Sequence, residues 1–280
     1  MSSAETPPVY DSDKRRAALL TPFANFVEHR SLIGLLVRRD ITVRYKRSAL
    51  GVWWTLLNPL LTTAVLWAVF SQIFRFADAD ITVPFVVYLL SGVLIVTFFA
   101  QGVAAVGGSI VNSSAILTKV HVPPEVFAVS AAAAAMTNFF FSLVPLLIIQ
   151  LVLGVGIPWT ALLAWIPAVA LLALVTGIGL VVASVAVFFY DVMDLTAVGI
   201  QLVSYMTPSF YPLAIVPENL TIFIMANPLY SYLLVFRSLI YMGEAPPVWA
   251  LAYMLATAVG FLALGVWTFA RSWKNLIVLL

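Results

Sequence analysis

Six long apolar stretches, separated by short polar segments, dominate the pattern of this chain. A helix needs about 20 residues to cross a membrane. The stretches are continuously apolar rather than alternating, which favours helices over the strands of a β-barrel. The pattern therefore predicts an all-α membrane protein with six transmembrane helices. Their expected ranges are Val52–Phe74, Phe85–Val106, Val126–Val152, Leu162–Phe189, Leu195–Pro212 and Val248–Ala270.

The segment before the first span has a different pattern. Residues 1–22 hold no apolar period and are expected to form a disordered cytoplasmic tail. From about Phe23 to Arg47 the chain is too charged to span a membrane, yet it places Leu32, Leu36 and Val43 on one side of a helix. This pattern predicts an N-terminal amphipathic interface helix that lies along the cytoplasmic membrane surface.

Another apolar segment, Leu213–Gly243, lies between the fifth and sixth spans. It is too short for two crossings and is broken by prolines and asparagines, which is typical of re-entrant or interfacial helices buried against protein. Two such helices are expected, at about Glu218–Met225 and Leu229–Met242. They form either a periplasmic gate or a simple outer cap. The candidate gate residues are Pro217, Glu218, Asn227, Pro228 and Arg237.

Charge is scarce and unevenly placed. Hydrophobic residues make up 63% of the chain and charged residues 9%, against about a quarter charged in soluble domains. If the N-terminus is cytoplasmic, all 14 Lys and Arg residues except Arg75 and Arg237 fall on the cytoplasmic side. This distribution satisfies the positive-inside rule, which predicts an even number of spans and two cytoplasmic termini. Basic residues beside a membrane are expected to meet lipid headgroups rather than nucleic acid.

No catalytic or metal-binding pattern is found in the sequence. Cysteine is absent, His29 and His121 are far apart, and neither an HExxH motif nor a GxxxxGK[ST] phosphate loop occurs. The spans hold no Asp, Glu, Lys or Arg apart from Asp191 and Asp194, at the turn between the fourth and fifth spans. Ion-coupled transporters usually keep such residues at the membrane midplane. Energy is therefore expected to come from a partner chain, with no cofactor on this one.

The cytoplasmic loop over residues 107–125 contains a run of turn-forming, helix-capping and helix-ending residues. It opens with Gly107-Gly108, continues through Asn112-Ser113-Ser114 as an N-cap, and ends at Pro123-Pro124. The pattern predicts a short helix through Lys119. Such a helix is either a docking surface for a partner or merely a connecting turn.

Aromatic residues are plentiful in and beside the spans. Rings that line a pore would let sugar faces slide with little specific hydrogen bonding, whereas the alternative is packing or lipid contact. The candidate channel aromatics are Trp53, Trp54, Phe98, Phe99 and Tyr211.

Four segments in order carry a resemblance to one family. They are RRDITVRYKRSALGVWW at 38–54 followed by Leu57-Asn58-Pro59-Leu60, LTKVHVPPEV at 117–126, FYDVMD at 189–194 leading into TPSFYP at 207–212, and YPLAIVPE at 211–218 followed by Asn227-Pro228-Leu229. Beyond about residue 25 the chain resembles the ABC-2 type polysaccharide-export permeases (Wzm-like), which export O-antigen, capsule, teichoic acid and galactan. It departs from the family pattern at Val122-Pro123-Pro124 and Tyr190-Asp191, which concern partner docking.

The resemblance implies a half-transporter in the bacterial inner membrane, with residues 23–280 forming an ABC-2 type transmembrane domain. Two copies would form a homodimer, and two nucleotide-binding ATPase subunits, which carry ATP and Mg, would dock beneath it. The implied substrate is a polysaccharide linked to polyprenyl diphosphate, of the O-antigen or galactan type. Together with the Ala- and Val-rich composition, the Rfb-like character of the resemblance suggests a galactan exporter from an actinobacterium.

The resemblance also suggests roles for two groups of residues. The short cytoplasmic helix and its flanks would couple the permease to the ATPase through Asn112, Ser113, Ser114, Leu117, Lys119, His121 and Glu125. Basic residues before the first span would meet the lipid diphosphate, because the planar fork of arginine suits phosphate. That group comprises Arg38, Arg39, Arg44, Lys46 and Arg47. Ordinary headgroup anchoring is the alternative for each.

Two other functions stay open on the sequence alone. An intramembrane glycosyl- or acyltransferase acting on a polyprenyl lipid would need acidic or histidine residues at a membrane face, and only Asp191 and Asp194 qualify. An ABC-2 exporter of a small lipid or drug would share the same topology.

Overall fold

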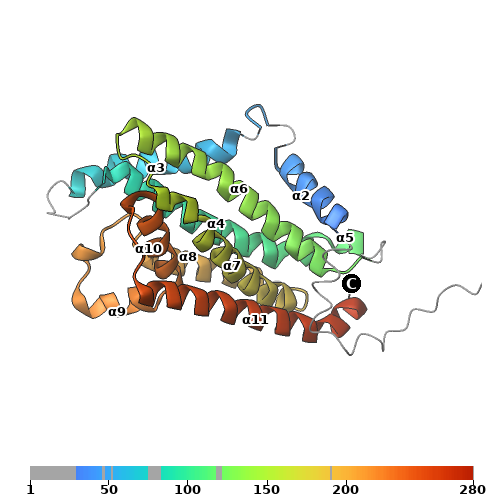
Figure 1. Cartoon of the computed structure of the whole chain (residues 1–280). Helices are drawn as coiled ribbons and strands as arrows, with labels where there is room; N and C mark the ends of the chain where they lie inside the picture. The colour runs from blue at the N-terminus through green and yellow to red at the C-terminus, as the bar shows by residue number, and fades with distance from the viewer. Residues whose placement is uncertain are drawn as a thin grey trace, which may run out of the picture.

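The computed structural model describes residues 30–45, 48–51, 53–74, 83–117, 122–189 and 191–279. Within these ranges the chain is helical and has no strand, which confirms the predicted all-α class (Figure 1). The α-helices are α2 (Arg30–Tyr45), α3 (Trp53–Phe74), α4 (Phe85–Asn112), α5 (Ser114–Leu117), α6 (Glu125–Val152), α7 (Trp165–Ala186), α8 (Asp191–Met206), α9 (Glu218–Ala226), α10 (Pro228–Arg237) and α11 (Val248–Leu279). Two 3₁₀ helices, η2 (Trp159–Leu163) and η3 (Leu213–Ile215), and a π-helix, η4 (Ser238–Met242), complete the described elements.

Helices α4 and α7 form the centre of the bundle. Helix α4 packs against α6 and α7, and α11 packs along α7. The last contact is a backbone contact, because a β-carbon on Gly177 would overlap the backbone of Phe261 and one on Gly265 would overlap Gly177. Small residues of this kind let helices approach closely in membranes, where packing rather than water exclusion drives association.

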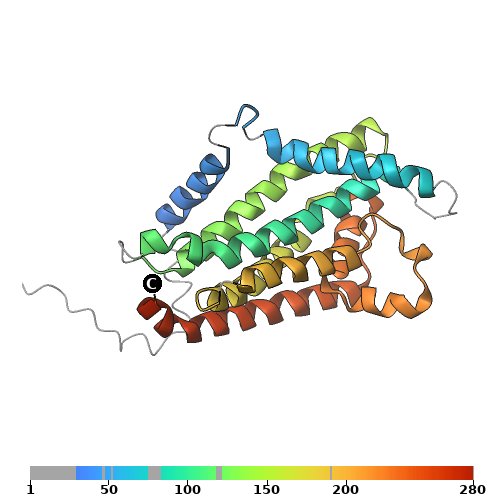
Figure 2. The same cartoon turned by 180° about the vertical axis from the view of Figure 1, so that it is seen from behind.

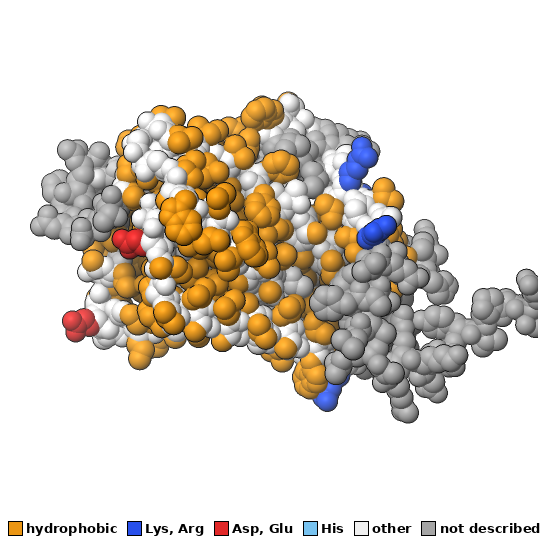
Figure 3. Space-filling view, viewed as in Figure 1, with side chains coloured by type: hydrophobic (Ala, Val, Ile, Leu, Met, Phe, Trp, Pro, Cys, Tyr) orange, Lys and Arg blue, Asp and Glu red, His pale blue; other side chains and the backbone are white. Residues whose placement is uncertain are grey.

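The outside of the bundle is apolar along its middle. On the face shown in Figure 3, hydrophobic side chains cover the centre, Lys and Arg side chains lie at one end, and Asp and Glu side chains lie at the other. The basic end holds α2, α5 and the end of α11, and the opposite end holds α9 and the start of α10 (Figures 1 and 2). This arrangement is the one that a membrane protein needs, since charge is costly in hydrocarbon.

Five helical segments of the described chain are long and apolar enough to span a membrane: Trp53–Ser71, Phe85–Asn112, Glu125–Val152, Trp159–Ala186 and Val248–Ser272. The pair formed by Glu218–Ala226 and Pro228–Met242 passes the same test together, but it bends by 88° at its break. The count is therefore five spans, or six if this bent pair is one span. The five segments correspond to the expected first, second, third, fourth and sixth spans.

The expected fifth span, Leu195–Pro212, is a shorter helix than predicted. Helix α8 covers 16 residues, which is about 24 Å at 1.5 Å per residue and less than the roughly 30 Å hydrocarbon core. It starts earlier, at Asp191, and ends at Met206. Thr207 precedes Pro208, and a residue before proline avoids the helical conformation. The remainder of the expected span is an irregular segment, Thr207–Pro212.

The expected end of the second span at Val106 is also wrong, because α4 continues to Asn112. The prediction that Gly107-Gly108 opens a loop is wrong, because both residues are helical and buried. A β-carbon on Gly107 would lie 2.8 Å from Cγ1 of Val182. This glycine therefore serves the contact between α4 and α7 rather than a turn. The other two differences are that α7 ends at Ala186, and that α11 runs beyond Ala270.

The N-terminal helix and the bent pair occur where the pattern predicted helices. Helix α2 packs Leu32, Ile33 and Leu36 against Val126 and Phe127 at the start of α6. Val43, expected on the same face, is instead 61% exposed. Helix α9 has nearly the bounds of the first predicted piece, and the second piece is divided between α10 and the π-helix η4, which ends at Met242. Their interfacial and re-entrant positions relative to a membrane stay predictions.

Candidate functional site

A groove of about 900 Å³ lies between α2, α3, α4 and α6. Its wall is polar for a protein so rich in apolar residues. The lining contains the amides Asn58, Gln101, Asn112 and Asn138 and the hydroxyl residues Thr55, Thr97, Ser109, Ser113, Ser130 and Ser142.

Most of the serine hydroxyls in this groove are already used by their own helices. Ser109 donates to the carbonyl of Val106 at 2.6 Å, and Ser130 donates to that of Phe127 at 2.9 Å. Ser142 donates to the Asn138 carbonyl at 2.9 Å and to Thr55 of α3 at 3.2 Å. Such bonds use the single donor of each hydroxyl within the protein, whereas the hydroxyl oxygen can still accept a hydrogen bond.

The side-chain amides are different. Asn58 of α3, Gln101 of α4 and Asn138 of α6 line the same groove, and none of the three side chains hydrogen bonds to any residue that the structure describes. Asn58 and Gln101 are exposed, while Asn138 is 9% exposed. An amide has both donors and acceptors, and leaving it unpaired in an apolar setting is costly. These groups are therefore available to water or a polar ligand.

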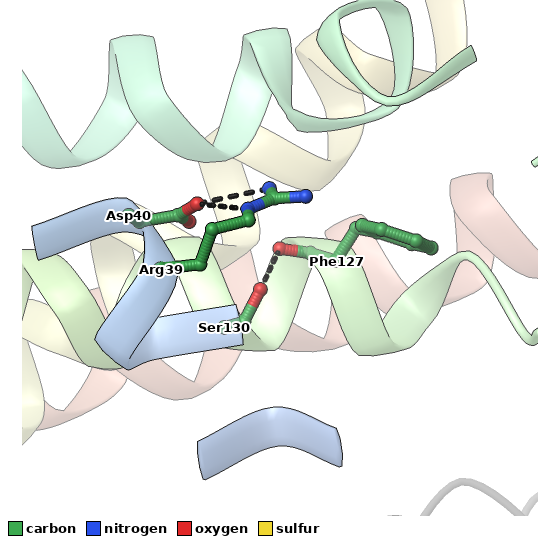
Figure 4. A network of polar contacts seen from close by, with 4 residues as sticks. All are labelled: Arg39, Asp40, Phe127 and Ser130. Carbon is green, nitrogen blue, oxygen red and sulfur yellow. Dashed lines mark hydrogen bonds and ion pairs between the residues drawn. The ribbon is translucent and has the colours of Figure 1, made fainter. Parts of the chain in front are cut away.

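Charge at the groove is balanced. Arg39 donates to one carboxylate oxygen of Asp40 through Nε at 3.1 Å and Nη2 at 2.9 Å. Figure 4 shows this pair on α2, beside Phe127 and Ser130 of α6. Arg39 and Asp40 are the only charged residues among the described groove lining. A partly exposed pair of this kind contributes little stability, but it leaves the lining without net charge.

Only two of the five predicted channel aromatics line the groove. They are Trp54 and Phe98, and Phe98 stacks on Phe139 with ring centroids 4.8 Å apart. Phe99 is buried in the main core, and Trp53 is exposed outside the groove. Tyr211 lies in the irregular segment after α8.

The predicted basic cluster is only partly described. Arg38 is exposed on α2 and Arg39 lines the groove. The backbone of Arg44 belongs to α2, whereas Lys46 and Arg47 lie outside the described residues.

The predicted N-cap run is correct only in part, because Ser113 directly precedes α5 and its carbonyl accepts from the backbone N–H groups of Ile116 and Leu117. Asn112 is the last residue of α4 rather than an N-cap, and the Ser113 backbone N–H caps that helix on Ile110 and Val111. Helix α5 then covers only Ser114–Leu117.

Residues on either side of α5 join it to the rest of the protein. Leu117 packs against the cluster of Leu36, Val126 and Phe127, and Glu125 lies in the first turn of α6. Lys119 and His121 lie outside the described residues.

Arg237, predicted as a gate residue, is a buried tether. Its guanidinium donates to Ser91 Oγ at 3.2 Å and to the carbonyls of Pro208 at 3.1 Å, Tyr88 at 3.0 Å and Ser209 at 3.1 Å. It also lies 3.7 Å from the centre of the Tyr88 ring. Among the described residues it has no carboxylate partner. It fastens the segment after α8 to α4.

The remaining gate residues surround the same segment. Asn227 caps α10 by accepting from Leu229 at 3.0 Å and donates to Val203 and Thr207 at 2.9 Å. Pro228 is the first residue of α10, and Pro217 and Glu218 begin the exposed α9.

Tyr211, in the segment that Arg237 fastens, keeps its proton. Burial, and secondarily the nearby Tyr88, raises the pKa of the Tyr211 phenol. The neutral phenol donates to the Tyr205 carbonyl at 3.2 Å.

The acidic residues considered for an enzyme lie outside the groove lining. Asp191 and Asp194 are exposed in the first turn of α8, where the positive end of the helix dipole stabilises carboxylates. Within the described chain, no group of His, Cys, Asp or Glu is arranged to hold a metal ion. Neither aspartate lines the groove.

The amide residues Asn58, Gln101 and Asn138 were not predicted as site residues, although a carboxamide inside an apolar span is itself a signal of polar contact.

Comparisons with known proteins match this architecture. The family profile described as "ABC-2 type transporter" matches residues 31–241. The chain is 27% identical over 217 residues to an O-antigen export system permease protein RfbA of Klebsiella pneumoniae, covering 76% of this chain and 81% of the relative. It is 28% identical over 232 residues to the RfbA of Myxococcus xanthus, covering 80% and 87%. Both relatives are described as permeases.

Proposed function

Because the chain belongs to the ABC-2 type transporter family, we propose that it is the membrane subunit of an ATP-driven exporter of lipid-linked polysaccharide. The observation that carries the proposal is the groove, whose lining combines free amides with the aromatic rings of Trp54 and Phe98. A polyhydroxylated chain suits such a lining, whereas an apolar lipid or drug would leave the amides unpaired. Similarity to O-antigen export permeases supports this class of cargo.

The proposed cargo is a glycan of the O-antigen or galactan type on polyprenyl diphosphate, moved outward across a bacterial inner membrane. In this scheme both termini and α2 face the cytoplasm. Arg38 would meet the diphosphate first, because it is exposed and has no ion pair within the described residues. Arg39 would have to leave Asp40 to do the same.

A second copy of the chain would complete the pathway. The groove lies to one side of the bundle, bounded by α2, α3, α4 and α6. Helix α3 exposes Leu61, Val65 and Val69, and α8 exposes Leu195, Val198 and Leu202. Apolar faces of this length suit contact with lipid or with another helix, so we propose a homodimer served by two ATPase subunits that bind ATP and Mg.

Helix α5 offers a route for coupling. Ile116 is 37% exposed on α5, while Leu117 faces inward onto Leu36 and Phe127. Phe127 also lines the groove. A force applied to α5 by an ATPase would therefore pass through packed side chains to α2, α6 and the groove wall.

The bent pair would serve as the outer gate. Helix α9 is largely exposed, with Ile222 at 68% and Phe223 at 58%. Helix α10 is largely buried, and Asn227 and Arg237 at its two ends bind the segment after α8. The movable part in this scheme is α9, and α10 is the fixed part.

The test is co-purification of the full chain with the ATPase subunit of its own system, followed by ATP turnover. We expect a stable complex, and we expect Ile116→Ala to weaken association by about tenfold, the usual effect of removing an interface anchor. The matched control is Ile222→Ala, which removes the same side chain at the opposite end of the bundle and should leave association unchanged.

Two results would count against the proposal. If the chain associates with no ATPase, it is not the membrane half of an ABC exporter. If Ile116→Ala and Ile222→Ala behave alike, α5 is not the docking element.

A further inference from the structure

Side-chain amides without a hydrogen-bond partner in the described chain line one groove from three different helices. Asn58 lies on α3, Gln101 on α4 and Asn138 on α6. Residues so far apart in sequence share a wall only because the bundle brings their helices together. The serine hydroxyls of the groove mostly donate within their own helices, so the amides supply side-chain donors that those hydroxyls no longer offer.

We infer that this groove selects an uncharged sugar chain and discriminates against acidic glycans. The inference rests on the proposed export function and adds the chemical class of the cargo. Sugar hydroxyls donate and accept hydrogen bonds, and so do carboxamides, so each amide can serve a hydroxyl in either direction. The ring of Trp54, which is 45% exposed, supplies apolar surface for the faces of the sugar ring, whereas Phe98 is only 4% exposed.

The discrimination follows from the charges in the lining. Arg39 and Asp40 are the only charged residues of the described lining, and they neutralise each other at 2.9 Å. A uronate carboxylate entering the groove would lose water and find no unmatched cation among the described lining residues. Moving an unpaired charge from water into a less polar site is unfavourable, whereas a neutral hydroxyl exchanges water for an amide at little cost.

Because Arg39 is neutralised by Asp40 alone among the described residues, one substitution at Asp40 changes the charge of the groove lining. Asp40→Asn keeps the size of the side chain and removes its charge, so Arg39 becomes an unmatched cation beside the groove. Arginine binds carboxylates through two parallel hydrogen bonds. This variant should gain affinity for an acidic chain while keeping its amides for a neutral one.

The experiment is saturation-transfer difference NMR on the purified full chain in lipid nanodiscs. The two probes are hexagalacturonate and its fully methyl-esterified form, which share sugar, linkage and length and differ in charge. We expect the ester to bind the wild-type chain at least about tenfold more tightly than the acid, since the acid brings unpaired charge. Asp40→Asn should reduce the ratio of ester affinity to acid affinity by about tenfold, because Arg39 can then form a charge-assisted contact with the acid.

Two controls separate charge from folding. Asp194→Asn makes the same change of charge at an exposed site on α8 and should leave the ratio unchanged. Gln101→Ala should weaken binding of the ester by about fivefold, which corresponds to the loss of one hydrogen bond. Each variant is accepted only if it remains monodisperse and has the same melting temperature as the wild-type chain.

Equal binding of acid and ester to the wild-type chain would overturn the inference, and so would an unchanged ratio in Asp40→Asn. Binding of neither probe would also overturn it, because the groove would then not be a sugar site. None of these results bears on ATPase association, which tests the proposed function separately.

Discussion

Two polar regions lie within this apolar bundle, and they differ in whether their hydrogen bonds are complete. Around Arg237, a single guanidinium bonds to three carbonyls and a hydroxyl and stacks on Tyr88. In the groove, the amides of Asn58, Gln101 and Asn138 bond to nothing in the described chain. The first region joins segments of the protein, and the second presents unused donors and acceptors to open space.

The comparison separates structural from functional polarity. A buried polar group that is fully bonded stabilises one arrangement of the chain, and its loss leaves its partners unpaired. A polar group without protein partners adds little to stability and is retained for another reason, of which contact with a ligand is the simplest. Arg237 should therefore respond to mutation in stability, and the groove amides should respond in binding.

The largest expected effect is that of Arg237→Met. Removing the guanidinium leaves the carbonyls of Tyr88, Pro208 and Ser209 without this donor in a buried site. We expect a loss of about 3 kcal/mol or more of unfolding free energy, measured by thermal and denaturant unfolding in detergent. Arg38→Met is the control, since Arg38 is exposed. Equal losses in the two variants would remove the contrast between the regions.

Asn227→Ala should have the next largest effect. Asn227 caps α10 and bonds across to Val203 and Thr207. Loss of a helix cap costs about 1 to 2 kcal/mol. Its neighbour Asn219 is exposed on α9, so Asn219→Ala serves as the matched control in the same unfolding assay. A smaller loss at Asn227 than at Asn219 would contradict the tethered position of α10.

Ser91→Ala tests a single contact of the Arg237 region. The serine hydroxyl accepts from Arg237 Nε at 3.2 Å and donates to the Tyr88 carbonyl at 2.8 Å. One acceptor among four is removed, so we expect a loss of about 1 kcal/mol. The control is Ser130→Ala, whose hydroxyl bonds only to the preceding turn of its own helix. The double variant of Ser91→Ala and Arg237→Met should lose less unfolding free energy than the sum of the losses in the two single variants, because the two residues share one contact.

The smallest effect on stability is expected at the groove. Gln101→Ala and Asn58→Ala remove exposed amides that have no partner in the described chain. Both should stay within about 0.5 kcal/mol of the wild-type unfolding free energy, as surface substitutions do. Their export activity should nevertheless fall, measured as polysaccharide reaching the cell surface. A stability loss comparable to that of Arg237→Met would mean that these amides are structural.

Much of the fold could be predicted from the sequence, because spans are long apolar runs. The bounds of α3 and α6 were predicted within one residue, and the break at Asn227-Pro228 was recognised from its residue types. Prediction failed where local signals had tertiary causes. Gly107-Gly108 indicates a turn by composition, but the pair lies inside α4 where Gly107 contacts Val182.

The candidate site was less accessible to prediction. The sequence suggested aromatics and basic residues near α2, and of these Trp54, Phe98 and Arg39 do line the groove. It did not suggest the amides, because no periodicity tells which face of α4 turns toward α6. Arg237 was assigned to an outer gate on the basis of topology alone, and its burial became visible only in the assembled bundle.

The sequence by itself determined the membrane class, the helices and the ABC-2 family, since hydropathy and short motifs are local properties of the chain. Only the tertiary structure decided which polar residues are bonded and which are free. The partners of Arg237 lie 28 to 149 residues away in sequence, and the amides of the groove come from three separate helices. A hydrogen bond depends on distance and direction in space, which the order of residues does not contain.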